Sequence, residues 1–480
     1  MNRYLTYQEG ELLFEDVALS EIAQEMYTPF FVYSKAAILE KVEAFKQAFA
    51  DVKPMMAYSM KALDTTLILK MLQERGCGVG VSNLYELRRA LAAGFQPTSI
   101  VFNSNGLADY EIPDILKHRP LVINVGNLFE LEPLNRFAAE LDSGVRIGLR
   151  LNLGIDTGGF TGTNTGACDS RVGIQRSELD LALALISKFS QLNLVGIACH
   201  CGSQIAQLAP WIKMSEEMAR IYKDIRQRGF NLEYLDLGGG YPVGYGRMDY
   251  LEIKKIARNI VPHIKDLDCR VILEPGRYFT AEAGVLVTSV LGVKDIGQKF
   301  YVVCDAGFAE LPRPAMYRLS HEIIPLKEPK ACKPKPEGAF AVEGAPSEPT
   351  EVATAPTTPD PGEFLRRFDL PEDLIQRFRI AEQFGTARPP GESVKADVIG
   401  PGDEGLDYLA HDIDICIPKR GDMLAVLNVG AYGRTMSSNY ASRLRPPEIL
   451  IERDKFETIR AREFLEDLTS CDLEESEVDS

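Results

Sequence analysis

The chain has 480 residues, of which 45% are hydrophobic and 25% charged, a composition typical of globular proteins. This length exceeds that of one ordinary compact domain and predicts one large domain with a smaller one. The net charge of -16 argues against a nucleic-acid partner, because DNA and RNA binders need clustered lysine and arginine.

The nine cysteines have no regular spacing, so we expect reduced thiols and no metal site. Residues 1–15 carry acidic side chains and no apolar core, unlike a signal peptide. No apolar run is long enough to span a bilayer. We therefore expect a cytoplasmic protein without a membrane partner.

Short apolar runs alternate with helical patterns from about residue 54 to residue 274. The predicted strands are residues 56–60, 79–81, 99–102, 121–124, 145–151, 195–200, 234–237 and 271–274. The predicted helices include residues 67–75, 84–93, 178–189, 211–228 and 250–264. Eight strand–helix units predict an α/β fold, a (β/α)₈ TIM barrel that spans residues 32–283.

From residue 284 the pattern changes to strands without intervening helices, which predicts a C-terminal β-rich domain over residues 284–464. Its expected strands are residues 284–293, 300–305, 422–428 and 448–452. We expect the N-terminal segment, residues 1–31, to pack with this domain. An insertion at residues 328–361 is dense in Pro, Ala, Glu and Thr, which predicts disorder, and a charged helix is expected at 362–384. The acidic tail, residues 465–480, is expected to fray.

Catalytic groups of such barrels follow the carboxyl ends of the strands. Lys61 follows the first predicted strand, His200 ends the sixth, a run of three glycines (238–240) follows the seventh, and Glu274 ends the eighth. Each has an ordinary structural interpretation when taken alone. Together they provide what pyridoxal phosphate needs: a lysine that bonds an aldehyde, a flat side chain, a glycine-rich phosphate cradle and a carboxylate for the pyridine nitrogen.

Five motifs in order resemble the fold-type III pyridoxal-phosphate decarboxylases, the family of diaminopimelate, ornithine and arginine decarboxylases. The motifs are AYSMKA (57–62), HCGSQ (200–204), LGGGY (237–241), EPGR (274–277) and GAYG with MSS (430–433, 436–438). The resemblance implies a barrel of the alanine-racemase type. It also implies that Lys61 carries the cofactor, that His200 stacks on its ring and that Glu274 holds its ring nitrogen. The groups that it places around the phosphate and nearby substrate atoms are Ser203, Gly239, Gly240, Gly276, Arg277 and Tyr432.

Two further segments resemble those of diaminopimelate decarboxylases and bear on the substrate. Arg313 and Tyr317 match the residues that meet the distal carboxylate, and Glu404 matches the one that receives the distal ammonium. Asp403 stands where the family has the cysteine that reprotonates the α-carbon, so the resemblance assigns the acid role to Asp403. Leu63, in place of the usual Asn, and the insertion are further departures.

The leading interpretation is therefore decarboxylation of meso-2,6-diaminopimelate to L-lysine, a step of lysine biosynthesis. Asp403 favours a second, in which a related amino acid is decarboxylated, such as a carrier-protein-bound or siderophore intermediate. A third, a non-catalytic pyridoxal-phosphate-binding protein, is disfavoured by the β domain and its motifs. The resemblance also implies a homodimer with shared active sites, in which the loop at 400–407 reaches the partner's cofactor.

Overall fold

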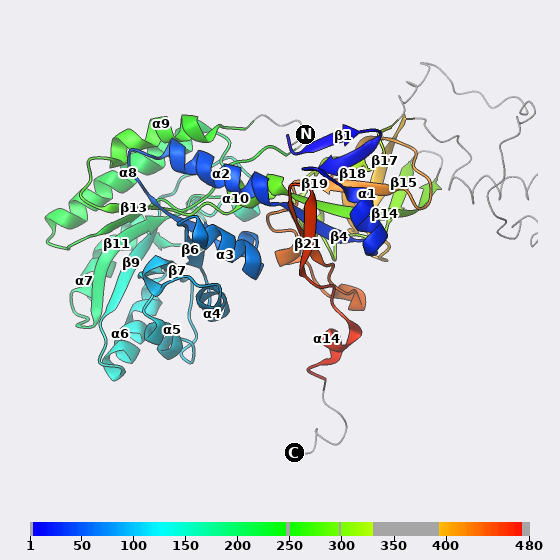
Figure 1. The fold of residues 1–480 in the computed structure, drawn as a ribbon. Coiled ribbons are helices and arrows are strands. Elements are labelled where there is room, and N and C mark those ends of the chain that lie inside the picture. The colour runs from blue at the N-terminus through cyan, green and yellow to red at the C-terminus, as the bar shows by residue number, and fades with distance from the viewer. Residues whose placement is uncertain (1–2, 246–249, 297–298, 330–392, 473–480) are drawn as a thin grey trace, which may run out of the picture.

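The computed structural model describes residues 3–245, 250–296, 299–329 and 393–472, and its larger part is a closed parallel barrel (Figure 1). The eight strands of the ring are β5 (Met55–Ser59), β6 (Gly78–Val81), β7 (Ile100–Asn103), β8 (Val122–Val125), β9 (Val145–Asn152), β11 (Leu192–Cys199), β12 (Tyr234–Asp236) and β13 (Arg270–Leu273). Pairing of β8 with β9 and of β13 with β5 closes the ring, and the short β10 (Ile174–Gln175) adds to β9. The predicted (β/α)₈ barrel is confirmed.

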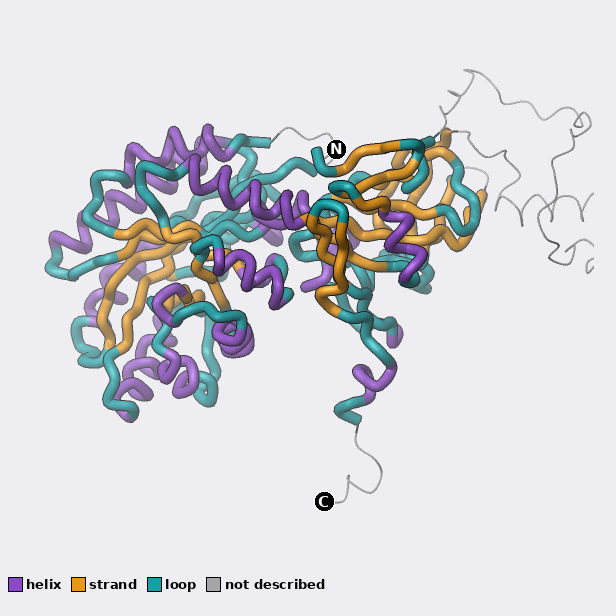
Figure 2. Tube along the Cα trace, in the orientation of Figure 1, coloured by secondary structure: helices purple, strands orange, loops and turns teal. Residues whose placement is uncertain are grey.

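Helices surround this ring on the outside (Figure 2). They are α2 (Lys35–Ala48), α3 (Thr66–Glu74), α4 (Leu84–Ala92), α5 (Ile112–His118), α6 (Leu131–Glu140), α7 (Leu179–Ile186), α8 (Leu208–Gln227), α9 (Ile253–Ile264) and the short α10 (Arg277–Thr280). In α9 the buried side chains recur every three or four residues, at Ile253, Ile256, Ala257, Ile260, Val261 and Ile264. This spacing puts them on one helix face, which the barrel and its neighbouring helices cover.

The second part is a β-rich domain built around a mixed sheet. Its strands are β4 (Phe30–Ser34), β14 (Gly284–Asp295), β15 (Phe300–Cys304), β16 (Ile323–Pro325), β17 (Ser393–Ile399), β18 (Tyr408–Cys416), β19 (Met423–Leu427), β20 (Glu448–Glu452) and β21 (Lys455–Arg460). The helices α11 (Arg313–Tyr317) and α14 (Leu465–Thr469) belong to the same part of the chain. The long strand β14 pairs with β4, β15 and β19, so it forms the centre of the domain.

The N-terminal segment packs on this domain. It forms the three-stranded sheet β1 (Leu5–Gln8), β2 (Glu11–Phe14) and β3 (Val17–Ala18), followed by α1 (Leu19–Glu25). Its apolar side chains share one buried cluster with side chains of β4, β14, β19 and β20. Strand β4 then enters the main sheet between β14 and β20, which ties the first residues of the chain to the last strands.

The structure differs from several sequence expectations. Strands β17, β18 and β21 and helix α2 were not among the predicted elements, and the tail begins with a short helix, α14. Helices α5 and α6 belong to the eight predicted strand–helix units, but their bounds were not predicted. Cys416 is disulfide-bonded, so the expectation of nine reduced thiols is wrong. The predicted disorder at 328–361 and the helix at 362–384 lie, except for residues 328–329, outside the described residues. Within the described ranges, no helix is long and apolar enough to cross a membrane.

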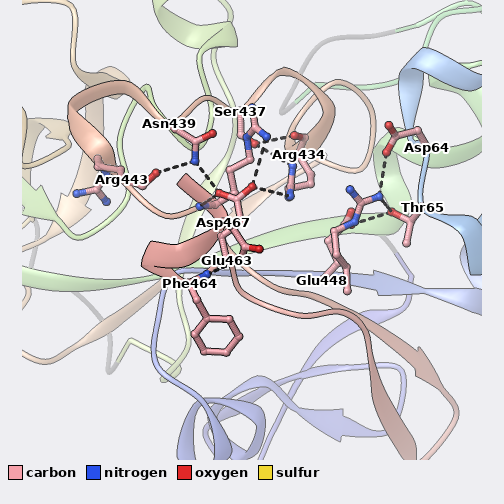
Figure 3. A network of polar contacts seen from close by, with 12 residues as sticks. Asp64, Thr65, Arg434, Ser437, Asn439, Arg443, Glu448, Glu463, Phe464 and Asp467 are labelled. Carbon is pink, nitrogen blue, oxygen red and sulfur yellow. Dashed lines mark hydrogen bonds and ion pairs between the residues drawn. The ribbon is translucent and has the colours of Figure 1, made fainter. Parts of the chain in front are cut away.

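Glu448 of β20 is a fully buried carboxylate between the two parts of the chain (Figure 3). It accepts hydrogen bonds from Tyr33 Oη (2.8 Å) in the β domain and from Thr65 Oγ1 (2.8 Å) in the barrel. It also pairs with Arg460 Nε at 2.5 Å, and Arg460 in turn contacts Asp64 at 3.1 Å. A buried charge with three donors links two sheets that share no strand pairing.

A buried histidine lies close to the same junction. The Nδ1 of His321 is 2.7 Å from the carbonyl oxygen of Leu427, so Nδ1 carries the proton, and the buried Nε2 has no partner among the described residues. Burial, with a further contribution from Arg313, lowers the pKa of His321 to about 3. His321 is therefore neutral in the folded protein at physiological pH.

We expect Glu448→Gln to lower the free energy of unfolding by about 3 kcal/mol, because Arg460 would lose its buried counter-charge. Urea unfolding measures the change. Glu452→Gln, on the exposed end of the same strand and paired with Lys35 at the surface, is the matched control and should stay within about 0.5 kcal/mol of wild type. Equal effects of the two substitutions would contradict the role assigned to Glu448.

The pH dependence of stability should also reflect His321. Its folded pKa lies below the ordinary value, so the unfolded chain takes up a proton below about pH 6.5 that the folded chain excludes. Stability is therefore lost as pH falls from 6.5 towards 3. Between pH 7 and pH 5, we expect His321→Gln protein to lose roughly 2 kcal/mol less stability than wild type. An unchanged slope would show that His321 protonates in the folded state. His263→Gln, on α9, controls for loss of an imidazole.

Candidate active site at the mouth of the barrel

A cavity of about 420 Å³ lies at the carboxyl ends of the barrel strands. Barrel residues form most of its wall, and Tyr317, Tyr432, Thr435 and Met436 of the β domain complete it. Ten of the residues singled out in the sequence line this one cavity: Lys61, His200, Ser203, Gly239, Gly240, Glu274, Gly276, Arg277, Tyr317 and Tyr432.

Lys61 lies in a single 3-10 turn that directly follows β5. The turn is fixed on one side by Ser59, whose N–H donates to Pro275 O at 3.0 Å. On the other side Ala62 O accepts the N–H of Tyr432 at 2.8 Å. Tyr432 has φ +61°, a left-handed backbone that non-glycine residues rarely adopt. The β domain is thus attached to the residue next to Lys61.

His200 follows β11 and forms part of the cavity wall. Its Nδ1 accepts the N–H of Gly239 at 3.1 Å, so the ring proton lies on Nε2. Burial, with smaller contributions from Arg150 and Lys61, lowers the pKa of His200 to about 3. The imidazole is therefore a neutral flat surface rather than a proton donor at physiological pH.

The three glycines after β12 form a cradle that side chains would fill. Gly238 and Gly240 have φ values of +64° and +106°. A Cβ on Gly239 would lie 2.4 Å from Glu274 O, and one on Gly240 would lie 2.5 Å from Gly202 O. Only glycine permits this close approach. The N–H groups of Gly238 and Gly239 donate to Asp236 Oδ1 and His200 Nδ1, so it is Gly240 whose N–H can face an anion such as a phosphate.

Glu274 belongs to a network of buried polar side chains inside the barrel. Its Oε2 accepts from Asn103 Nδ2 at 2.7 Å, Asn124 Nδ2 donates to Asn103 Oδ1 at 2.9 Å, and the same Nδ2 lies 3.1 Å from Asp236 Oδ2. Burial, followed by the charge of Glu274, raises the pKa of Asp236 well above its usual range, and burial also raises that of Glu274. Burial therefore disfavours two negative charges at this depth, while the nearby charge of Arg150 acts in the opposite direction on Glu274.

Arg277 lines the cavity and Arg313 lies behind two of its lining tyrosines, and neither has a carboxylate partner among the described residues. Arg277 donates to Ser203 Oγ at 2.9 Å and to Tyr245 Oη at 2.7 Å, and Arg313 donates to the same hydroxyl at 3.1 Å. Arg313 is 1% exposed and its guanidinium lies near the rings of Tyr317 and Tyr432. The predicted Arg313 and Tyr317 thus lie beside the cavity, and uncompensated guanidinium groups suit an anionic ligand.

Asp403 and Glu404 are not brought to this cavity. They line a second one, of about 340 Å³, and the two cavities have no lining residue in common. Their loop is exposed from residue 401 to residue 406, whereas Asp407 is buried. The Asp407 carboxylate accepts the N–H groups of Gly402 (2.6 Å) and Phe308 (2.7 Å), and it lies where a Cβ on Gly307, Gly400 or Gly402 would be. Asp407 therefore fixes a protruding loop.

Sequence reasoning missed several cavity or network residues. Four of them lie at or near the carboxyl end of a predicted barrel strand, which is the same criterion that identified Glu274. These four are Asn103, Asn124, Arg150 and Asp236. Tyr245 lies in an irregular loop, where neither spacing nor strand position marks it. Only the folded contacts place its hydroxyl between two arginines.

These residues fit pyridoxal phosphate. The glycine cradle, the neutral imidazole, the lysine and a carboxylate supported by Asn103 surround one cavity of suitable chemistry. Two buried donors, Nε of Arg277 and Nε of Arg313, have no partner among the described residues. Unpaired buried donors are unfavourable unless a ligand or solvent satisfies them.

Comparisons with known proteins agree with this geometry. Residues 35–281 match the family model described as the pyridoxal binding domain of pyridoxal-dependent decarboxylases. The diaminopimelate decarboxylase of Aquifex aeolicus is 32% identical over 96% of this chain and 96% of its own, and that of Vibrio cholerae is 30% identical over 97% of each. The crystal structure of Helicobacter pylori diaminopimelate decarboxylase complexed with L-lysine has a TM-score of 0.78 and 29% identity, and covers 94% of this chain and 98% of that one.

Proposed function

The chain belongs to the pyridoxal-dependent decarboxylases, and from this premise we propose that it converts meso-2,6-diaminopimelate to L-lysine. The observation that carries the choice of substrate is the pair of buried arginines, Arg277 and Arg313, beside the cavity that contains Lys61. Decarboxylation requires one carboxylate to leave. A second carboxylate on the substrate gives the two guanidinium groups a ligand.

Pyridoxal phosphate, when bound, supplies the electron-accepting ring that makes loss of CO₂ feasible. Lys61 is the side chain that would bond it covalently. His200 would lie against its ring. Gly239, Gly240, Gly276 and Ser203 would surround its phosphate, with Gly239 providing space rather than a donor, because its N–H is bonded to His200. Glu274, kept in place by Asn103, would hold a proton at the ring nitrogen.

The substrate contacts come from both parts of the chain. Arg277, Arg313, Tyr317 and Tyr432 would bind and orient the distal carboxylate, which leaves the other end of the substrate at Lys61. The side chains of Tyr317 and Tyr432 also line the cavity and would help to exclude water when the substrate fills it.

Asp403 and Glu404 enter the proposal through a second copy of the chain. Their loop protrudes, and Leu406 at its tip is 63% exposed, which suits a segment covered by a partner. In a homodimer this loop would reach the partner's cavity, where Asp403 would donate a proton to the α-carbon and Glu404 would receive the distal ammonium. Because Asp403 replaces the family's cysteine, a related amino acid is retained as an alternative substrate.

The function is tested by incubating the cofactor-loaded protein with meso-diaminopimelate, LL-diaminopimelate, lysine, ornithine and arginine while CO₂ release is measured. We expect rapid release from meso-diaminopimelate and none from lysine, ornithine or arginine, because these three lack the distal carboxylate; LL-diaminopimelate shows whether the cavity distinguishes the stereoisomers. Lys61→Ala should reduce turnover by roughly a thousandfold or more and abolish the visible band that borohydride removes. Faster release from another member of the panel would replace the proposed substrate.

The shared site is tested by mixing two defective chains. Asp403→Asn keeps the shape of the side chain and removes its acidic proton, so turnover should fall by roughly a hundredfold or more. After verified subunit exchange with Lys61→Ala chains, about a quarter of native activity should return, because half of the randomly paired dimers contain one intact site. Asp414→Asn, on the exposed face of β18, is the matched control. Absence of recovery would show that each chain supplies its own acid.

A further inference from the structure

Tyr245 occupies a fixed position between the two arginines. Its backbone is held by Gly244, whose N–H donates to Glu282 Oε1 at 3.2 Å and whose carbonyl accepts from Asn428 Nδ2 at 3.2 Å. Its side chain is buried, and the hydroxyl oxygen accepts from Arg277 Nη1 at 2.7 Å and Arg313 Nη1 at 3.1 Å. One oxygen therefore joins a guanidinium of the barrel to a guanidinium of the β domain.

The electrostatics of this cluster are unusual. Burial alone would raise the pKa of Tyr245, but Arg277 and Arg313 outweigh it and hold that pKa below its ordinary value. The ring of His321 lies edge-on to Tyr245 at 5.4 Å, and as a neutral imidazole it adds no further charge. Tyr317 and Tyr432 are the other rings that face the arginines. The cluster is thus a buried concentration of positive charge with a single shared acceptor.

We propose that Tyr245 is a positioning residue that joins Arg277 and Arg313 into one anion-binding unit, which makes the cavity select a substrate with a second carboxylate. The inference rests on the proposed function for the identity of that substrate. Two like charges this close repel each other, and the shared hydroxyl is what fixes their separation and the direction of their remaining donors. Without it, each guanidinium would lose a hydrogen bond and the pair would spread apart.

The test uses ligands of equal length with and without carboxylates. Pimelate has two carboxylates on a seven-carbon chain, and pimelamide has two uncharged amides on a chain of the same length. Their dissociation constants are measured on the full-length, cofactor-loaded protein by calorimetry. Wild type should bind pimelate more tightly, and Tyr245→Phe, which keeps the ring and removes the oxygen, should weaken pimelate by roughly tenfold while pimelamide changes little.

A merely structural role would affect both ligands alike. Tyr222→Phe is the matched control, because it also removes a buried hydroxyl, one that lies 2.8 Å from each of two carbonyl acceptors, Leu232 O and Asp268 O, away from the cavity. It should leave the preference for pimelate unchanged. If Tyr245→Phe protein fails to bind cofactor, Tyr245→Gln, whose amide oxygen is also an acceptor, takes its place and should retain part of the preference.

Kinetics provide a second measurement. With meso-diaminopimelate, Tyr245→Phe should raise KM roughly tenfold and leave kcat within about twofold, since the reacting end of the substrate is untouched. Equal losses of pimelate and pimelamide affinity, which leave the ratio between them unchanged, would overturn the inference. A wild-type protein that prefers pimelate but releases no CO₂ from meso-diaminopimelate would refute the proposed function alone.

Discussion

The closure of the parallel sheet is the constraint on which the rest of the molecule depends. Strand β13 pairs with β5, so the last strand of the barrel lies beside the first. At the top of this seam Ser59 Oγ donates to Glu274 O at 3.2 Å, although the two residues are 215 positions apart in the chain. Because all eight strands run the same way, every residue that follows a strand lies at one mouth. This shared strand direction brings together Lys61, His200, the glycine run and Glu274.

A second attachment adds the β domain to this mouth. The bond from Tyr432 N–H to Ala62 O holds a loop of the β domain against the turn that contains Lys61. It requires a left-handed backbone at a non-glycine residue, a conformation that the surrounding contacts must maintain. Both parts of the chain therefore build the site. The barrel supplies the lysine, the glycine cradle and the buried carboxyl pair, and the β domain supplies Arg313, Tyr317 and Tyr432. A chain with only the barrel would keep Arg277 and lack Arg313, the second cation of the pair.

The barrel could be predicted from sequence because its strands are short apolar runs in regular alternation with helices. Predicted and observed strands differ by no more than three residues at either end, as in residues 195–200 against Leu192–Cys199. Strand β18 was missed because polar and charged side chains interrupt its pattern, as at His411, Asp412 and Asp414. The site residues were likewise predictable only where a local sequence pattern marks them. Residues at strand ends or in motifs were found, whereas Tyr245 acts through contacts that no local pattern encodes, and the separation of Asp403 from Lys61 is visible only in three dimensions.

The clamp formed by Asp407 has a consequence for assembly. The loop at residues 400–407 folds around a carboxylate of its own chain, and three glycines provide the space for it. Its shape is therefore set before anything covers it. The proposed association would not have to order it, and little conformational entropy would be lost at that step. A rigid loop of this kind would dock on a partner in the conformation that it already has. It would permit repeated separation and re-association of subunits without refolding, and it would tolerate no side chain at the three glycine positions.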